Sequence, residues 1–320
     1  MSTVKNYLSL IRFSHTIFAM PFAMIGFALG IRYWNEWTGY FSQNRFVGFS
    51  GPTEFLEDLP HSLDEAVVKF VLVVLCMIFA RSAAMAFNRW LDVEFDARNP
   101  RTAIREIPRG IISKSSALRF VIFNCLAFIV CTWFINLLCF CLSFVALAVV
   151  LGYSYTKRFT PLCHLVLGLG LSLAPIGAYL AVTGHFALLP ILFSLTVIFW
   201  VSGFDIIYAL QDEEFDKNQQ LYSMPSWLGK AKALRVSEFL HVLSTACVVS
   251  AGWYGHFGWW YWGGVAVFMG MLIYQHLLVK PNDLSRVNLA FMTANGIASV
   301  VFAVFVITDL FSTNYAHILK

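Results

Sequence analysis

Residues 66–96 read AVVKFVLVVLCMIFARSAAMAFNRWLDVEFD, and this stretch decides the fold. Its first part, residues 66–88, is almost entirely apolar, and a helix needs about 20 such residues to cross a bilayer. Three acidic residues follow directly, at Asp92, Glu94 and Asp96. We therefore expect a membrane-spanning helix whose end carries a cluster of carboxylates.

The composition extends this expectation to the whole chain of 320 residues. Hydrophobic residues make up 59% of it, the mean hydropathy is +0.70, and only 12% of the residues are charged. Soluble domains carry about 25% charged residues, so this chain lacks the polar surface of a soluble fold, a coiled coil or a disordered protein. The net charge of +4 does not suggest a nucleic-acid partner. We expect an all-α, polytopic membrane protein.

Apolar runs of sufficient length predict about nine transmembrane helices in a single domain over residues 1–320. The predicted spans are residues 14–33, 66–88, 117–135, 136–153, 162–182, 186–208, 236–255, 259–279 and 288–311. The third and fourth spans are nearly continuous, and we expect a tight turn near Asn136 between them. The polar segment 35–65 is expected to form a long external loop.

Basic residues are unequally distributed between the two sides of this predicted bundle. They gather near the N-terminus and after the second, fourth, sixth and eighth spans. Cytoplasmic loops of membrane proteins carry an excess of Lys and Arg. We therefore expect an integral protein of the cytoplasmic (inner) membrane, with its N-terminus in the cytoplasm and its C-terminus outside.

The first acidic cluster has a regular spacing. Asn88, Asp92 and Asp96 follow one another at intervals of four residues, which places them on one face of a helix. Arg81 falls near the same line, deeper in the predicted span. Ionisable groups inside a membrane span are costly and usually functional, so Arg81 is a candidate for binding an anionic group.

A second acidic cluster follows the sixth predicted span. Asp205, Tyr208, Asp212 and Asp216 share a helical face by the same arithmetic. Two stripes of carboxylates on one side of the membrane repel each other unless a cation neutralises them. Mg²⁺ is typically bound by one or two carboxylates together with phosphate oxygens of a substrate. The alternative interpretation is a solvated helix end with ordinary surface charge.

Two basic elements are predicted on the same side as the acidic clusters. The segment after the first cluster contains Arg101 and Arg105 together with two prolines and a glycine, a composition typical of a structured loop. Lys157 and Arg158 follow the fourth span. Because guanidinium groups bind phosphate oxygens through paired hydrogen bonds, cations and carboxylates together indicate a metal–diphosphate site. For any single basic residue, the alternative is that it only reflects the excess of Lys and Arg in cytoplasmic loops.

Four motifs in this order carry a family resemblance. They are N-x-x-x-D-x-x-x-D from Asn88, N-P-R-T-x-x-R-x-I-P from Asn99, Y-x-x-x-K-R from Tyr153, and D-x-x-Y-x-x-x-D-x-x-x-D from Asp205. The likeness spans roughly residues 8–235 and resembles the UbiA superfamily of intramembrane aromatic prenyltransferases. Residues 13–22 and 211–216 are most similar to the 4-hydroxybenzoate polyprenyltransferase branch, including members that prenylate a dihydroxynaphthoate in the futalosine route to menaquinone.

The resemblance implies a bundle of about nine helices around a central cavity and a Mg²⁺-dependent reaction. A polyprenyl group would pass from polyprenyl diphosphate to a ring carbon of an aromatic hydroxy acid, 4-hydroxybenzoate or a dihydroxynaphthoate, in quinone biosynthesis. Carried over by position, the metal-binding residues are Asn88, Asp92, Asp96, Asp212 and Asp216. Residues that would grip the diphosphate or line the same cavity are Arg101, Arg105, Lys157, Arg158 and Asp205. The loop departs from the commoner family pattern at Glu106, where many members have proline.

The aromatic acceptor requires groups of its own. Its carboxylate needs a cationic partner, for which Arg81 is the candidate. His15, Tyr155 and Tyr208 are further candidates for contact with the acceptor. Either Asp205 or the departing diphosphate takes the ring proton, and the sequence leaves both open. The histidines in the second half of the chain show no metal-binding spacing and receive no role.

Two other functions remain open from the sequence alone. A cation-coupled membrane transporter also carries acidic residues in a polytopic fold, although these usually lie near the middle of the membrane. The second open function is prenyl transfer to a different acceptor. The length of the prenyl chain cannot be read from the sequence.

Overall fold

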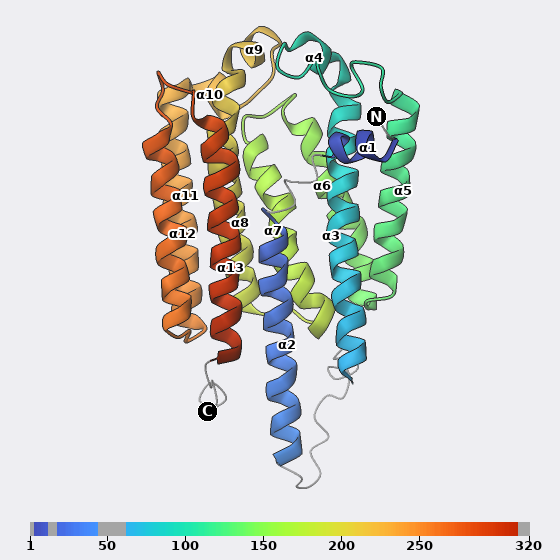
Figure 1. Ribbon diagram of the computed structural model, residues 1–320, viewed down its shortest axis with the longest axis vertical. Helices are drawn as coiled ribbons and strands as arrows, with labels where there is room; N and C mark the ends of the chain where they lie inside the picture. Colours follow the sequence, from blue (N-terminus) through green and yellow to red (C-terminus); the bar gives the residue numbers. More distant parts are fainter. Residues whose placement is uncertain (1–2, 12–17, 44–61, 313–320) are drawn as a thin grey trace.

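The computed structural model describes residues 3–11, 18–43 and 62–312. Over these ranges the chain folds into helices and forms no β-strand, which confirms the all-α prediction. The long helices run side by side along one axis (Figure 1). They are α2 (Met20–Gln43), α3 (Leu63–Leu91), α5 (Lys114–Trp133), α6 (Leu137–Thr156), α7 (Cys163–Thr183), α8 (Leu188–Ala209), α11 (Lys230–Tyr254), α12 (Trp259–Leu278) and α13 (Asn295–Ser312).

Short helices gather at one end of this bundle, near the top of Figure 1. They are α1 (Thr3–Leu10), α4 (Val93–Arg98), α9 (Glu213–Asn218) and α10 (Met224–Leu228). We call this the motif end, because both acidic clusters lie there. The sequence predicted that the N-terminal segment and the segments after the second and sixth spans lie on the same side of the bundle, and this is confirmed. That the motif end faces the cytoplasm stays a prediction.

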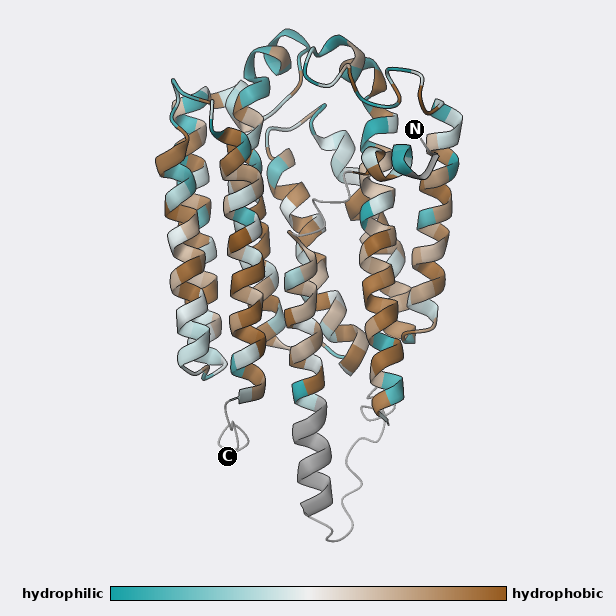
Figure 2. Cartoon of the chain, in the orientation of Figure 1, coloured by the Kyte–Doolittle hydropathy of each residue, from teal (hydrophilic) through white to brown (hydrophobic). Residues whose placement is uncertain are grey.

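Seven helices within the described ranges are long and apolar enough to cross a membrane, and Met20–Tyr33 is a shorter apolar helix. α12 has the length of a span, but four aromatic residues at its start and Gln275 and His276 near its end lower its hydropathy. Figure 2 shows apolar residues along the helices and hydrophilic residues at the motif end. The chain is an integral membrane protein, while the predicted count of nine spans is not confirmed.

The acidic clusters do not form the continuous helical stripes that the four-residue spacing predicted. α3 ends at Leu91 and α4 begins at Val93, while Asp92 between them has φ −95° and ψ 14°. In the second cluster the 3-10 helix η3 (Leu210–Asp212) joins α8 to α9, and Asp212 has φ −104° and ψ 5°. Both aspartates thus leave the α-helical region of the backbone. The helix is interrupted at each of these aspartates, so each acidic cluster lies on successive helices rather than on one continuous helix.

Two predicted connections can be compared with the structure. α6 follows α5 after the turn at Asn136, whose Oδ1 accepts a hydrogen bond from the Cys139 N–H at 2.8 Å and caps α6. The Nδ2 of the same side chain donates to the carbonyl of Leu180 at 2.9 Å, so the predicted tight turn is confirmed and tied to α7. The predicted loop 35–65 is helical as far as Gln43, and residues 44–61 lie outside the described ranges.

An aromatic core joins α2, α8, α12 and α13. Phe22, Trp200, Phe268 and Phe302 are fully buried, with neighbouring ring centroids 5.3–6.4 Å apart. Trp200 Nε1 donates to Asn295 Oδ1 at 2.8 Å, so its polar atom is satisfied inside the core. This packing holds α8, the helix that also carries Asp205, in place.

One buried carboxylate makes a testable contribution to stability. Asp309 of α13 is fully buried and accepts hydrogen bonds from the Gly258 N–H at 2.8 Å and the Tyr261 N–H at 3.3 Å, so it caps the start of α12. Loss of such a cap costs about 2 kcal/mol at the upper end of the usual range. We expect Asp309→Ala to lower the melting temperature in detergent, measured by thermal unfolding. Ser312→Ala, at an exposed position of the same helix, should leave it unchanged. Equal melting temperatures for both variants would contradict the capping role.

Candidate active site

A polar cavity of about 290 Å³ lies at the motif end, between α3, α4, α7, α8 and the loop that follows α4. It brings together most of the residues that the sequence singled out. Those that line it are Arg81, Asn88, Asp92, Asp96, Arg101, Arg105, Lys157, Arg158, Asp205, Tyr208 and Asp212. Residues more than 100 positions apart in the chain therefore meet in one place.

Two predicted residues are placed outside the cavity, and a third is not among the described residues. Asp216 is fully buried behind the cavity, where Lys157 lies 2.7 Å from its Oδ1. Tyr155 is 43% exposed and packs against Phe87 outside the cavity. Tyr153, two residues earlier, lines the cavity instead. His15 lies outside the described residues.

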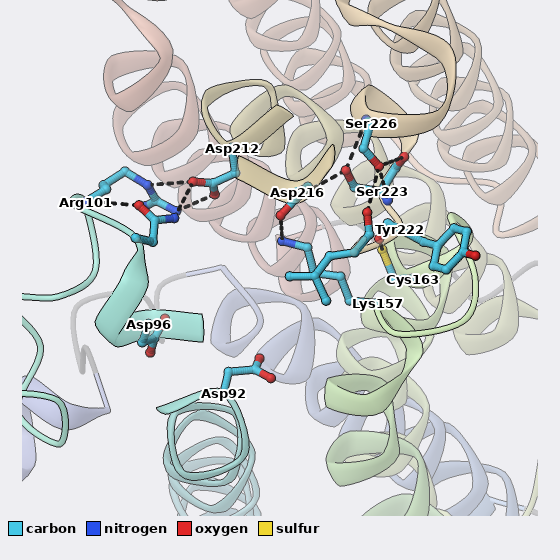
Figure 3. Close-up of polar contacts among 12 residues, drawn as sticks. Asp92, Asp96, Arg101, Lys157, Cys163, Asp212, Asp216, Tyr222, Ser223 and Ser226 are labelled. Carbon is cyan, nitrogen blue, oxygen red and sulfur yellow. Dashed lines mark hydrogen bonds and ion pairs between the residues drawn. The ribbon is translucent and has the colours of Figure 1, made fainter. Parts of the chain in front are cut away.

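Four carboxylates of the two acidic clusters are each paired with a basic residue of the predicted site. The pairs are Asp92–Arg158 at 3.1 Å, Asp96–Arg105 at 2.8 Å, Asp212–Arg101, and Asp216–Lys157 at 2.7 Å. Figure 3 shows Arg101 facing Asp212, and Lys157 facing Asp216. The repulsion expected between the two clusters is thus relieved by the chain's own cations, and acids and bases alternate around the cavity.

Arg101 is the most extensively held of these cations. Its guanidinium forms an ion pair with Asp212 and donates to the Tyr208 hydroxyl at 2.9 Å. The Asn99 side chain accepts from the Arg101 backbone N–H at 3.0 Å and donates to Asp212 Oδ1 at 3.2 Å. The loop after α4 is therefore fastened to the end of α8, which confirms that it is a structured loop.

The unusual Glu106 of this loop has a structural partner. Arg89, whose side chain is almost fully buried, donates to Glu106 at 2.6 Å and to the backbone carbonyl of Ser9 at 3.3 Å. The hydroxyl of Ser9 also donates to Glu106. This acid thus joins α3, α1 and the loop that carries Arg101 and Arg105, so a proline at this position would lose both contacts.

Burial and charge act in opposite directions on the groups at the mouth of the cavity. Burial raises the pKa of the Asp92 carboxyl, although Arg158 acts to lower it. Burial acts to lower the pKa of Lys157, but the neighbouring Asp216 outweighs it, and the pKa of Lys157 is raised. Lys157 therefore stays charged, while at Asp92 the effect of burial outweighs that of Arg158.

A second, apolar cavity of about 320 Å³ adjoins the polar one. The two share Arg81, Met85, Tyr153, Leu167 and Leu171 in their walls. Arg81 Nε is buried and has no hydrogen-bond partner among the described residues. A polar cavity that suits an anionic head group thus adjoins an apolar cavity that suits a hydrocarbon chain. Arg81, with its unsatisfied Nε, lies between the two.

Sequence reasoning missed two residues of the polar cavity. His164 is buried and lies 2.7 Å from Asp205, and the ring of Phe291 lies 4.3 Å from that of Tyr208. Phe291 is presented by a π-helical turn, η4 (Leu289–Ala294), and such turns are frequent at functional sites. Both contacts join different helices, so no spacing along the chain encodes them.

A family model, sequence relatives and solved structures all indicate one protein family for this chain. Residues 59–297 match the model of the UbiA prenyltransferase family. The chain is 30% identical over 244 residues to 4-hydroxybenzoate octaprenyltransferase from Nitrosomonas europaea, covering 76% of this chain and 83% of the relative. It is 28% identical to the enzyme of that name from Francisella tularensis subsp. novicida, covering 74% and 83% of the two chains.

Solved structures agree with these relatives. The apo structure of a UbiA homolog from Aeropyrum pernix K1 is similar with a TM-score of 0.71 and 25% identity, covering 91% of this chain and 95% of that one. A UbiA homolog from Archaeoglobus fulgidus shares the fold, with a TM-score of 0.66, 18% identity and coverage of 97% and 100%. The predicted resemblance, including its 4-hydroxybenzoate polyprenyltransferase branch, is confirmed, while the narrower likeness to menaquinone-type members stays a prediction. This chain belongs to the UbiA prenyltransferase family of membrane enzymes.

Proposed function

We propose that this enzyme transfers a polyprenyl group from polyprenyl diphosphate to a ring carbon of an aromatic hydroxy acid, with Mg²⁺, in quinone biosynthesis. The observation that carries this proposal is the junction of the two cavities, with Arg81 unsatisfied at their boundary. The polar cavity suits a diphosphate and the apolar one suits a prenyl chain. Relatives named 4-hydroxybenzoate octaprenyltransferase support the aromatic acid as acceptor.

The residues of the polar cavity fit a magnesium ion by their donor chemistry. Carboxylate and amide oxygens are the ligands that Mg²⁺ prefers, and we assign this role to Asn88, Asp92, Asp96 and Asp212 in the cavity wall and to Asp216 behind it. Among the described residues, no three acidic, histidine or cysteine side chains are close enough to hold a metal ion by themselves. The Archaeoglobus fulgidus homolog was solved bound to DMAPP and Mg²⁺.

The basic residues bind and stabilise the leaving group. When bound, Mg²⁺ supplies positive charge that stabilises the departing diphosphate. Arg101, Arg105, Lys157 and Arg158 offer N–H donors to the same oxygens, and fixed donors of this kind cost no reorganisation during the reaction. Because each of the four is paired with a carboxylate in this structure, an arriving anion would compete with those carboxylates for them.

The rest of the cavity protects the allylic cation and orients the acceptor. Breakage of the C–O bond leaves an allylic cation that water would quench, and the apolar lining excludes water. Arg81 holds the acceptor's carboxylate and Tyr208 contacts its ring, whereas Tyr155 and His15 remain candidates without an observed place in the cavity. A ring carbon then forms a bond to the prenyl carbon, and its proton passes to Asp205 or to the diphosphate.

The position of the acids disfavours the transporter alternative. Asp92, Asp96 and Asp212 lie at helix ends, at the motif end, whereas transporter carboxylates usually lie on broken helices near the middle of the membrane. We place the motif end on the cytoplasmic side of the inner membrane, on the distribution of Lys and Arg.

A side-by-side assay of acceptors tests this proposal. Purified enzyme with Mg²⁺ and a polyprenyl diphosphate is given 4-hydroxybenzoate, a dihydroxynaphthoate or a phenol without a carboxylate, and products are identified by mass spectrometry. We expect ring-prenylated product from 4-hydroxybenzoate, and little from the phenol because Arg81 would lack its partner. Absence of product from every aromatic acid would refute the proposal.

A further inference from the structure

We propose that His164 is a positioning residue that holds Asp205 as an oriented carboxylate, ready to accept the ring proton; this inference rests on the proposed function. His164 lies in the first turn of α7, and Asp205 lies near the end of α8. His164 Nδ1 is 2.7 Å from Asp205 Oδ2, and the side chains are 4% and 24% exposed. The histidine is therefore enclosed, while the carboxylate keeps access to the polar cavity.

The contacts of His164 define where its proton lies. The Met224 backbone N–H points at His164 Nε2 at 3.2 Å. A backbone N–H can only donate, so Nε2 must be the unprotonated, accepting nitrogen. The proton of the neutral ring is then on Nδ1 and is donated to Asp205. An N–H on Nε2 would face the N–H of Met224, so the geometry favours the ring whose proton is on Nδ1 and is donated to Asp205.

Only one oxygen of Asp205 is used by this contact. Oδ2 accepts from His164, while Oδ1 has no hydrogen bond to a described residue, and Asp205 lines the polar cavity. A carboxylate with one oxygen held and the other directed to a substrate cavity is arranged as a general base. Of the two proton acceptors that the sequence left open, the geometry favours Asp205.

His164 is also linked to Asp216 of the second acidic cluster, through Met224 and Ser223. Ser223 Oγ donates to Asp216 Oδ2 at 2.9 Å, and Ser223 and the next residue, Met224, begin α10. His164 is held further by the Ser202 hydroxyl, which donates to its backbone carbonyl at 3.0 Å. The start of α10 thus links Asp216, at the proposed diphosphate site, to His164 and Asp205, so the proposed base and the leaving-group site are held in a fixed arrangement.

The proton transfer balances without any further reactant. The C–O bond of the prenyl diphosphate breaks with its electron pair on the diphosphate, and a ring carbon of the acceptor donates an electron pair to the prenyl carbon. The C–H bond at that ring carbon then breaks, its electron pair restores the aromatic ring, and the proton goes to Asp205 Oδ1. From there it passes to solvent or to the departing diphosphate.

The test compares two replacements of His164 that differ in one donor. His164→Leu removes the N–H that faces Asp205, whereas His164→Asn keeps an N–H the same number of bonds from Cα as Nδ1. We expect kcat to fall about 10²-fold in His164→Leu, with the KM for the prenyl diphosphate unchanged and most of the rate restored in His164→Asn. With ring-deuterated 4-hydroxybenzoate, His164→Leu should show a primary isotope effect on kcat that the wild type lacks, because loss of the ring proton becomes rate-limiting.

The controls separate positioning from folding and from the proposed function. Ser194→Ala removes another hydroxyl of α8 that donates to a backbone carbonyl of α7, that of Ser172 at 2.8 Å, away from His164, so it should keep the wild-type kcat and isotope effect. If His164→Leu shows no isotope effect, or if Asn restores nothing in a folded protein, the positioning role is wrong. If the wild type prenylates no aromatic acid, the proposed function fails instead, and the two failures are distinguished by the wild-type reaction alone.

Discussion

Replacement of Asp212 by asparagine is expected to lower the rate of prenyl transfer by about 10³-fold, at the upper end of what one preorganised electrostatic contact supplies. Asp212 lines the polar cavity, pairs with Arg101 and accepts from Asn99. Asparagine has the same shape and keeps one accepting oxygen, so the loop after α4 should stay fastened. The lost charge weakens a proposed ligand of the metal–diphosphate complex. The measurement is kcat/KM for the prenyl diphosphate with purified protein in Mg²⁺.

The matched control removes an acid from the same end of the molecule. Glu94 is exposed on α4 and does not line the cavity, so Glu94→Gln should retain the wild-type rate. An Asp212→Asn variant that kept more than a tenth of the activity would contradict the proposed role of the second acidic cluster. A loss of activity in both variants would point to net surface charge rather than to a site.

Replacement of Arg81 by glutamine is expected to raise the KM for the aromatic acid by about 100-fold, the size of a lost hydrogen bond to a charged group. Arg81 lies where the two cavities meet, and its Nε has no partner among the described residues. A buried guanidinium nitrogen without a partner is costly, so a substrate carboxylate would satisfy it. The KM for the prenyl diphosphate should change little, because its head group is held by other cations.

An uncharged acceptor supplies the control for Arg81. The methyl ester of 4-hydroxybenzoate lacks the carboxylate, so wild type and Arg81→Gln should use it with similar efficiency. If Arg81→Gln left the KM for 4-hydroxybenzoate unchanged, the carboxylate role would be wrong. If it raised both substrates' KM values equally, Arg81 would act on the shape of the cavity instead.

The sequence alone predicted the architecture and the membership of the site well. Apolar runs determine where helices can cross a membrane, and Asn136 marked a turn because its side chain caps the next helix. The acidic and basic motifs identified the residues of the polar cavity, since few charges occur in such an apolar chain and charged groups of this kind gather where they have a function.

What the sequence could not predict depends on contacts between helices. The four-residue spacing placed each acidic cluster on one continuous helix, but the helices are interrupted at Asp92 and Asp212. The choice of Tyr153 over Tyr155 depends on how α6 is rotated in the bundle. The pair His164–Asp205 joins α7 to α8, and nothing in the spacing of 41 residues between them signals it.

Removal of divalent metal ions tests the central claim most directly. Purified enzyme treated with EDTA is incubated with a polyprenyl diphosphate and 4-hydroxybenzoate, and ring-prenylated product is measured before and after addition of excess Mg²⁺. We expect no product in EDTA and full recovery with Mg²⁺, because the acidic clusters bind the diphosphate through the ion. Undiminished turnover in EDTA, or no transfer in Mg²⁺ by a folded enzyme, would contradict the account.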